Sequence, residues 1–102
     1  MLAAALRLRV LEGPGKSPTK VRQAAAQVAA GGPSTRDPHD QLARQIGESA
    51  HLVTDGQVAN VLAVAGSEKA TFEVIIAAAV GAGLLRWQQG IRALEEATGA
   101  PP

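Results

Sequence analysis

Apolar residues recur every three or four positions along most of this 102-residue chain, which is the repeat of an α-helix. Leu2, Leu6 and Val10 follow this repeat near the start. They predict a first helix over residues 1–11, although the alternation of apolar residues and arginine in its second half is also typical of a strand. The Gly-Pro-Gly run at residues 13–15 ends this element.

Two pairs of a capping residue and a proline mark the next two helix starts. Ser17 and Pro18 predict a second helix, with Ser17 as its cap and Pro18 at its first helical position, and the glycines after residue 30 end it. Asp37 and Pro38 repeat the signal for a third helix. The apolar stripe of the third helix is narrow and consists of Leu42, Ile46, Ala50 and Val53.

The most regular part of the chain runs from residue 53 to residue 94. Thr54 and Gln57 fit a capping box at the start of a fourth helix, which Gly66 ends. Ser67 then caps a fifth helix from about residue 68 to 97, roughly 45 Å long at about 1.5 Å per residue. This helix has a bulky stripe and a face of small residues. The stripe consists of Phe72, Ile76, Ala79, Gly83, Trp87, Ile91 and Leu94, and the small-residue face of Ala77, Ala78, Gly81, Ala82 and Leu85.

These elements predict an all-α protein of about five helices in a single domain, residues 1–102, with short N-terminal helices and one long C-terminal helix. A chain of this size buries only about two thirds of its unfolded surface. Phe72 and Trp87 are its only aromatic residues, and it has 11 glycines. We therefore expect a homo-oligomer, in which another subunit adds the apolar burial that one subunit lacks. Gly81 and Ala77 of the fifth helix are expected where two backbones approach closely, and Gly47 gives the third helix room for a close neighbour.

Charge is distributed unevenly along the chain, although the net charge is only +1. Residues 1–36 hold six Lys and Arg and one Glu, whereas residues 37–102 hold four Lys and Arg and eight Asp and Glu. Neither part contains a block of like charges, and the small net charge gives no general attraction to nucleic acid, so no nucleic-acid partner is expected. A weaker hypothesis is an anionic partner that contacts Lys16, Lys20 and Arg22.

The chain has no cysteine, which excludes disulfides, thiolate metal sites and thiol catalysis and fits a cytoplasmic protein. No positive residue precedes the apolar residues at the start, and Arg7 and Arg9 interrupt them, so they are not typical of a signal peptide. The apolar run at residues 74–85 is shorter than the about 20 residues that cross a bilayer. No membrane partner is therefore expected.

Glu48 and His51 are the candidate catalytic residues. They lie three positions apart near the end of the third helix, where a carboxylate and an imidazole could form an acid–base pair. An exposed ion pair on a helix surface is the commoner arrangement of such residues. The two histidines, His39 and His51, do not have the spacing of a metal site, and neither a metal nor a cofactor is expected.

The segment Gly15-Lys16-Ser17 looks like the end of a phosphate-binding loop. The full pattern requires a glycine where this chain has Val10. Pro18 also removes a backbone N–H beside the segment. A loop followed by a helix cap is therefore the expected role of these residues.

Three segments together resemble small proteins of the carboxymuconolactone decarboxylase and alkylhydroperoxidase superfamily. They are residues 11–15 (LEGPG), residues 51–55 (HLVTD) and residues 67–94, which contain F-E, A-A-A-x-G-A-G and R in the order typical of that family. The resemblance implies an all-helical, alkylhydroperoxidase-like bundle that forms trimers or hexamers. The alkylhydroperoxidase branch uses Cys-x-x-Cys followed by His, with a Glu in a proton relay. This chain lacks that motif, so the resemblance assigns no catalytic residue.

Two functions follow as expectations. The first is a cysteine-free helical subunit that self-associates and has a binding or accessory role towards an unknown small molecule, without thiol peroxidase activity. The alternative is a cofactor-free enzyme of the decarboxylase or isomerase type that acts on a small organic acid or lactone, with Glu48 and His51 as acid and base. A closed pocket containing both side chains would favour the enzyme, and their exposure on open surface would favour the first function.

Overall fold

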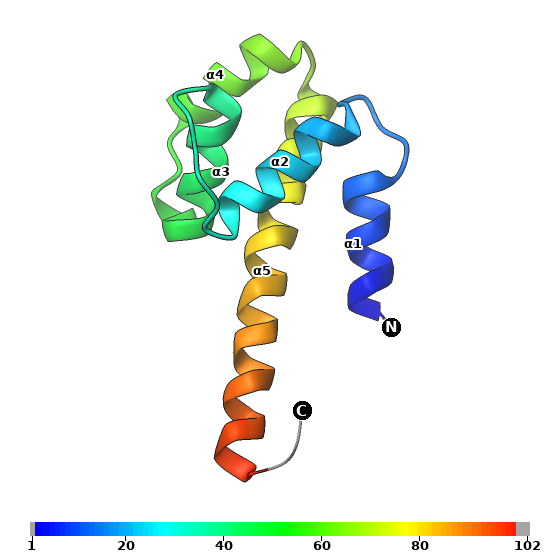
Figure 1. Ribbon diagram of the computed structural model, residues 1–102. Coiled ribbons are helices and arrows are strands. Elements are labelled where there is room, and N and C mark those ends of the chain that lie inside the picture. Colours follow the sequence, from blue (N-terminus) through cyan, green and yellow to red (C-terminus); the bar gives the residue numbers. More distant parts are fainter. Residues whose placement is uncertain (1, 100–102) are drawn as a thin grey trace.

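The computed structural model describes residues 2–99, so Met1 and residues 100–102 of the expected domain lie outside it. Five α-helices and one 3₁₀ turn follow one another as α1 (Leu2–Glu12), α2 (Thr19–Ala29), α3 (Pro38–Ser49), η1 (Ala50–Leu52), α4 (Asp55–Ala65) and α5 (Glu68–Thr98) (Figure 1). Within residues 2–99 there is no strand. The all-α prediction is therefore confirmed, and the strand alternative for the first element is wrong.

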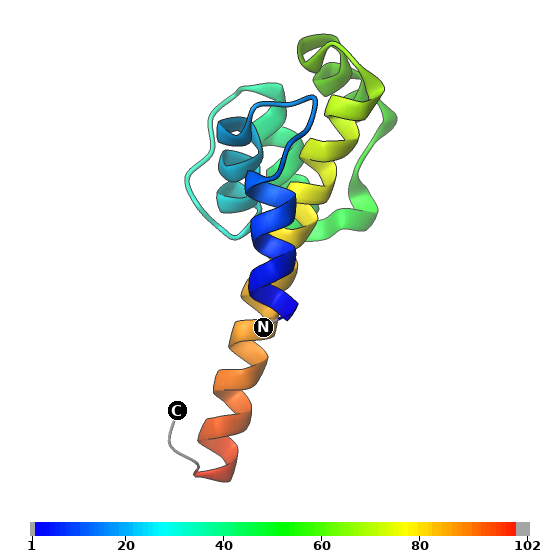
Figure 2. The same cartoon turned by 90° about the vertical axis from the view of Figure 1, so that its right-hand side faces the viewer.

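The long helix α5 is the axis around which the other helices are arranged. Its first half contacts α1, α2, α3 and α4, whereas its second half projects beyond them (Figures 1 and 2). α1 runs antiparallel to α5 along one side. The molecule is accordingly elongated, with principal extents of 49 × 28 × 20 Å.

The core is built mainly from small side chains. Alanines of α2, α3 and α5 make up about half of its residues, and its largest fully buried residues are Leu11, Leu42, Val61 and Val74. The small-residue face of α5 is the buried one, because Ala77, Ala78 and Ala82 all belong to the core. Phe72 and Trp87 are each 61% exposed, so neither aromatic ring contributes to it.

Two glycines allow the backbones of neighbouring helices to touch. A Cβ atom on Gly81 of α5 would overlap the backbone of Ala26 in α2. A Cβ atom on Gly47 of α3 would overlap the backbone of Ala29, also in α2. The prediction that these glycines lie at close approaches is confirmed, and both approaches occur within the subunit.

Most helix ends follow the capping signals in the sequence. The Asp37 carboxylate accepts a hydrogen bond from the first turn of α3, and Thr54 and Gln57 form the complete capping box of α4. Gly66 ends α4 in the left-handed conformation, with φ of 85°. The Ser67 hydroxyl accepts a hydrogen bond from the first turn of α5. These four predictions are confirmed.

Two predicted boundaries are wrong. Pro18 rather than Ser17 is the N-cap residue of α2, and proline has no side-chain acceptor, so no side chain caps that helix. The Ser17 hydroxyl donates to Glu73. α3 ends at Ser49 and does not continue to Val53. The Ser49 hydroxyl donates to the carbonyl of Glu48, a local bond that competes with the helix, and the 3₁₀ turn follows.

By length and composition α5 would be able to cross a membrane. Its most apolar 18-residue window has a mean hydropathy of 1.5, and 33% of that window is buried inside the molecule. The first half of α5 packs against the other helices, as a core helix does. The absence of a membrane partner and the cytoplasmic location both remain predictions.

Candidate functional site

The structure does not bring Glu48 and His51 together. Glu48 lies in the last turn of α3, where its side chain is 64% exposed and its carboxylate is 3.3 Å from Nε of Arg44. His51 lies on the following 3₁₀ turn and is also exposed. In the part of the chain that the structure describes, no hydrogen bond or ion pair joins Glu48 to His51. Both side chains are exposed, and Glu48 borders an open pocket of about 230 Å³ between α2, α3 and α5 that His51 does not line. Their catalytic role stays a prediction.

A dense polar cluster ties the loop after α1 to the second turn of α5. The Glu73 carboxylate accepts hydrogen bonds from the backbone N–H of Lys16 at 2.9 Å and of Ser17 at 2.7 Å. It also accepts one from the Ser17 hydroxyl at 2.6 Å. A Cβ atom on Gly15 would lie 2.7 Å from a Glu73 carboxylate oxygen, so a glycine is needed for the loop to wrap this closely. The segment that looked like a phosphate-binding loop therefore binds a carboxylate of its own chain.

These hydrogen bonds keep Glu73 ionised. The bond from the Ser17 hydroxyl is the largest cause that lowers the pKa of Glu73, from 4.5 to about 2. The backbone N–H groups of Lys16 and Ser17 and the charge of Arg22 act in the same direction, while desolvation opposes them. At neutral pH the loop is consequently held by a full carboxylate charge.

Arg22 of α2 lies beside this cluster and is only 3% exposed. Its two terminal nitrogens donate to the carbonyl of Val10 at 2.8 Å and to that of Gly13 at 2.6 Å, which satisfies acceptors at the end of α1. Its Nε atom has no hydrogen-bond acceptor among the described residues. Arg22 is therefore unavailable as an exposed contact beside Lys16 and Lys20.

Glu73 and Arg22 both border an open pocket between α1, α2 and α5. The pocket has a volume of about 320 Å³ and is lined by Arg9, Val10, Pro14, Arg22, Phe72, Glu73 and Ile76. Its charged side chains are thus two arginines and one carboxylate. The remainder of the wall is mainly apolar. We call this space the Arg22 pocket.

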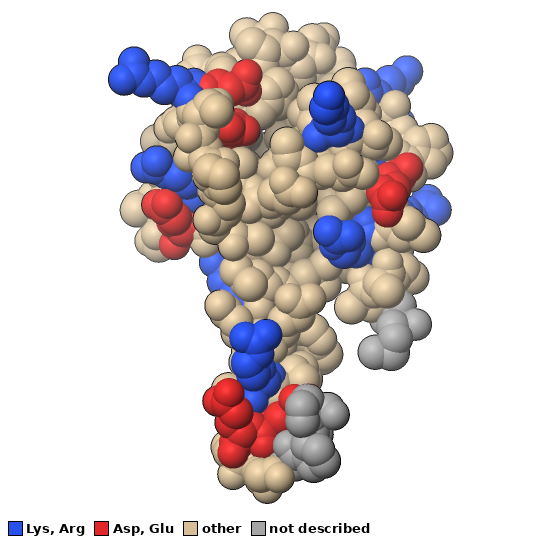
Figure 3. All heavy atoms as spheres, in the orientation of Figure 1, with Lys and Arg blue, Asp and Glu red and all other residues tan. Residues whose placement is uncertain are grey.

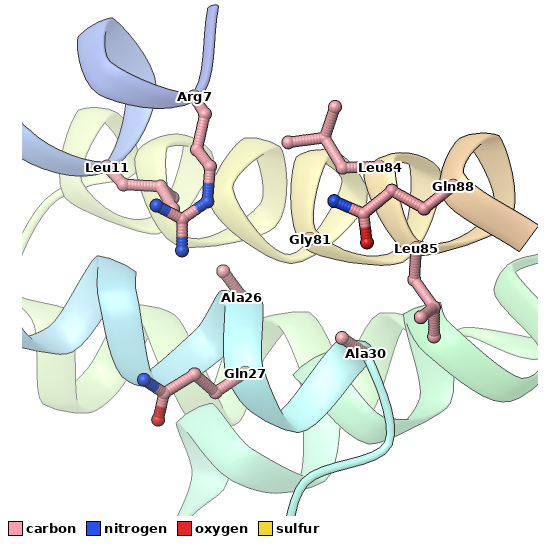
Figure 4. Close-up of a pocket in the computed structure, with 9 residues that line it drawn as sticks. All are labelled: Arg7, Leu11, Ala26, Gln27, Ala30, Gly81, Leu84, Leu85 and Gln88. Carbon is pink, nitrogen blue, oxygen red and sulfur yellow. The ribbon is translucent and has the colours of Figure 1, made fainter. Parts of the chain in front are cut away.

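A smaller pocket lies between α2 and α5, on the side of α1 that carries Arg7 and Leu11 (Figure 4). Its volume is about 190 Å³, and Arg7 reaches from α1 over the gap between the two helices. Leu84, Leu85 and Gln88 of α5 form another side. Arg7 is exposed, and no buried polar atom of the described residues that line this pocket lacks a partner. This pocket offers less defined chemistry than the Arg22 pocket.

An uncovered apolar surface runs along α5. We define the α5 stripe as Phe72, Ile76, Ala79, Gly83, Trp87, Gly90 and Leu94, which all lie within about 40° of the direction of Gly83 on a helix with 3.6 residues per turn. Gly90 takes the place of Ile91 of the predicted bulky stripe, because Ile91 lies about 80° from that direction. An apolar groove of about 280 Å³ lies along its middle and is lined by Leu6, Ile76, Ala79, Val80, Gly83 and Leu84. A Cβ atom on Gly83 or Gly90 would meet nothing within 4 Å. The stripe is thus open at Gly83 and Gly90, whereas Ile76 is partly buried beside α1.

Charged residues do not form a basic surface on the face shown in Figure 3. Lys and Arg side chains alternate there with Asp and Glu around a broad uncharged area. The hypothesis of an anionic macromolecular partner requires a continuous basic surface. The burial of Arg22 and the mixture of charges on this face both weaken that hypothesis.

Sequence reasoning identified neither Glu73 nor the buried position of Arg22. Glu73 stands between Phe72 and Val74 in an apolar helix, and its partner Ser17 is 56 residues away, so helical periodicity gives no sign of the contact. The available signal was the loop itself. A glycine-containing turn with free N–H groups binds anions in general, and a carboxylate of the same chain satisfies it as well as a phosphate does.

No cluster of three or more His, Asp and Glu side chains within residues 2–99 is arranged to hold a metal ion. No protein-family model matches the chain, and neither does any curated protein or solved structure. The resemblance to the carboxymuconolactone decarboxylase and alkylhydroperoxidase superfamily therefore stays a prediction, as does the trimer or hexamer that it implies.

Proposed function

We propose that this chain is a self-associating helical subunit with a binding or accessory role, and that two copies pair through the α5 stripe. The observation that carries the proposal is the self-complementary order of residues along that stripe. Without cysteine the subunit has no thiol chemistry. The exposed positions of Glu48 and His51 favour this role over the enzyme alternative.

The second half of α5 has few contacts within the subunit. Beyond Arg86, whose guanidinium donates to the carbonyl of Gly47 in α3, the helix projects from the body of the molecule and exposes Trp87 and Leu94 by 61% and 60% (Figure 1). Short isolated helices are marginally stable in water. A continuous row of exposed apolar side chains also marks an association surface. A second subunit on this row would stabilise the projecting turns and cover their apolar side chains.

The α5 stripe has the same spacing on both sides of Gly83. From Gly83 towards either end, successive stripe residues are four, three and four positions apart. An antiparallel copy that places Gly83 opposite Gly83 therefore matches every stripe position with another. The remaining pairs are Ala79 with Trp87, Ile76 with Gly90, and Phe72 with Leu94. In the two pairs nearest to Gly83, a large side chain meets a small residue. In the outermost pair, two large side chains, Phe72 and Leu94, meet each other.

This pairing places Trp87 of one subunit at the apolar groove of the other. Ile76, Ala79 and Gly83 line the groove, and they surround the position opposite Trp87 in the antiparallel arrangement. Insertion of a side chain between small residues of a facing helix is the geometry of close helix packing. Both subunits use the same surface in this contact, so a pair of copies leaves no stripe unpaired. A lipid bilayer would cover the same side chains but would require no matched spacing.

Trp87 allows the proposal to be tested directly, since it is the single tryptophan of the chain. We expect sedimentation at micromolar concentration to detect a dimer or a multiple of dimers. We also expect the fluorescence of Trp87 to shift to longer wavelength on dilution, as the indole leaves the apolar groove. Gly83→Leu places a large side chain at the axis and should give a monomer.

Gln89→Leu is the matched control. Position 89 lies about 120° around the helix from Gly83 at 3.6 residues per turn, so the same side chain enters the same helix away from the stripe. This variant should associate like the wild type. A wild-type chain that sediments as a monomer would refute the proposal. So would association of Gly83→Leu at the strength of Gln89→Leu, or a Trp87 shift that appears only when lipid vesicles are added.

A further inference from the structure

The helix α1 borders the α5 stripe on one side (Figures 1 and 2). Leu6 of α1 lines the apolar groove together with Val80. Arg9 lines the Arg22 pocket together with Glu73. On a helix with 3.6 residues per turn, Glu73 and Val80 lie about 60–80° from the direction of Gly83, both in the same sense of rotation. The contacts of α1 therefore define one flank of the stripe.

The same flank contains two residues of the projecting turns of α5. Ile91 and Glu95 lie about 80° and 120° from the direction of Gly83. Their sense of rotation is that of Glu73 and Val80, which lie beside α1. In the antiparallel pair the two-fold axis is perpendicular to both copies of α5, so corresponding flanks of the two helices meet. Ile91 and Glu95 of the partner subunit consequently lie on the side where α1 is.

Glu95 also matches Arg9 in its level along the pair. Glu95 follows Gly83 by twelve positions. With Gly83 opposite Gly83, it is level with the position twelve before, which is residue 71 of the other copy. Arg9 lies at this level, because it shares the Arg22 pocket with Phe72. One guanidinium of α1 and one carboxylate of the partner subunit thus come to the same place.

The Arg22 pocket and the end of α5 are complementary in charge. Two guanidinium groups and one carboxylate line the pocket, and that carboxylate already accepts hydrogen bonds from Lys16 and Ser17. The ion pairs found among residues 2–99 include neither Arg9 nor Glu95. A carboxylate of the partner subunit would balance the remaining positive charge of the pocket.

Ile91 supplies an apolar side chain for the same contact. It is 39% exposed, and Leu6 of α1 is 50% exposed. Ile91 follows Gly83 by eight positions and is therefore level with residue 75 of the other copy, beside Ile76. At that level the pocket has apolar walls and a volume of about 320 Å³, which is room for one aliphatic side chain.

We propose that α1 forms the second half of the pairing surface, in which Arg9 of each subunit forms an ion pair with Glu95 of the partner subunit and Ile91 of the partner subunit enters the Arg22 pocket. This inference rests on the proposed pairing through the α5 stripe. The ion pair occurs twice in each pair of subunits, because the contact has two-fold symmetry. In a parallel pair Arg9 and Glu95 would be separated by about 20 positions of α5, roughly 30 Å at about 1.5 Å per residue. The two charges therefore select the antiparallel orientation.

The proposal also accounts for the uneven charge of the chain. Residues 1–36 hold six Lys and Arg and one Glu, whereas residues 37–102 hold eight Asp and Glu and four Lys and Arg. Within one subunit the projecting end of α5 extends beyond α1 (Figure 1). Antiparallel pairing brings the basic α1 of one subunit to the more acidic end of α5 in the other.

Charge reversal on either helix tests the ion pair. Arg9→Glu and Glu95→Arg each place like charges together at both contacts, and the dissociation constant measured by sedimentation should rise roughly tenfold. Arg7→Glu and Glu96→Arg are the matched controls. Arg7 lines the smaller pocket instead, and Glu96 lies about 140° from Gly83 in the opposite sense. Both controls should stay within about threefold of the wild type, because distant surface charges are screened.

A mixture of the two variants distinguishes a contact between subunits from one within a subunit. When Arg9→Glu pairs with Glu95→Arg, both contacts join opposite charges, whereas each variant alone has like charges at both. An equimolar mixture should therefore form pairs at concentrations where each variant alone is monomeric. The double variant Arg9→Glu/Glu95→Arg should likewise recover the dissociation constant of the wild type to within about threefold.

The outcomes separate this inference from the pairing on which it rests. A wild-type chain that sediments as a monomer would refute the pairing and the ion pair together. If the wild type pairs and Arg9→Glu loses no more affinity than Arg7→Glu, the stripe contact stands and the ion pair is wrong. An equimolar mixture of Arg9→Glu and Glu95→Arg that pairs no better than either variant alone would also overturn the ion pair.

Discussion

Glu73 joins the loop after α1 to α5 through one carboxylate, and its protonation state decides how strongly the two are joined. Its pKa in the folded chain, about 2, is lower than the ordinary value of 4.5. The ionised carboxylate therefore stabilises the fold at all pH values above 4.5. That contribution is lost progressively as the pH falls from 4.5 to about 2, because protonation removes the charge that Ser17 and Lys16 bind.

Glu73→Gln should lower the free energy of unfolding at pH 7 by on the order of 1 kcal/mol, since the amide accepts fewer hydrogen bonds and carries no charge. The variant should also lose part of the fall in stability between pH 4.5 and pH 2 that the wild type shows. Urea unfolding followed by circular dichroism across this range measures both effects. Glu96→Gln, on the exposed end of the same helix, is the control. Identical pH profiles for the wild type and Glu73→Gln would contradict this account.

At the residue scale the sequence predicted those contacts whose partners are close in the chain. Asp37 and Thr54 cap helices through groups two or three residues away, so the residues themselves specify the contact. Ser17 has the same chemistry and sits before a proline, but Glu73 offers its hydroxyl a charged acceptor. The charge-assisted hydrogen bond holds the hydroxyl at Glu73, and the hydroxyl oxygen accepts no hydrogen bond from the first turn of α2. Sequence pattern alone does not include that competitor.

The packing of α2 against α5 depends on the absence of a side chain at Gly81. Gly81→Leu would force the two backbones apart at Ala26, and overpacking of this kind costs about 1–3 kcal/mol or more. We expect a loss of most of the stability of this small, alanine-rich core, measured as a lower midpoint of thermal unfolding. Gly83→Leu makes the same substitution two residues away, where the added side chain meets open space.

The Gly83→Leu control should keep the midpoint of the isolated subunit, because leucine is the better helix former and fits without overlap. Comparison of the two variants at a concentration where both are monomeric separates helix packing from self-association. If Gly81→Leu unfolds at the temperature of Gly83→Leu, the close approach of α2 and α5 is not a determinant of stability.

At the element scale, the sequence predicted that α5 has two faces. It did not predict which of the two is buried. Periodicity places Ala77 and Ala78 on one face and Phe72 and Trp87 on another. Large side chains usually bury more apolar area, which would put the bulky stripe in the core. The structure buries the alanines instead, because only small residues allow α2 to contact α5 along its backbone.

The candidate residues Glu48 and His51 were placed correctly near the end of α3, but the early end of that helix at Ser49 puts them on different elements.

At the scale of the whole molecule the number and order of the helices followed from the sequence, while the shape did not. Caps and glycines predicted the starts of α3, α4 and α5 and the end of α4. The projection of the last turns of α5 beyond the body depends on how far the four shorter helices reach along α5, which is a property of their packing (Figure 2). The Arg22 pocket likewise exists because α1, α2 and α5 converge from positions far apart in the chain.

The contact between Ser17 and Glu73 also bears on the order of events during folding. The contact joins residues that are 56 positions apart, so forming it costs the chain conformational entropy. Only the contacts made once α5 has docked on α2 offset that cost. Contacts of α2 with α3 and of α3 with α4 need much shorter closures. We therefore expect the Glu73 contact to form after the transition state. In stopped-flow circular dichroism Glu73→Gln should unfold faster than the wild type and fold at nearly the same rate, and a slower folding rate with unchanged unfolding would show that α1 and its loop dock early instead.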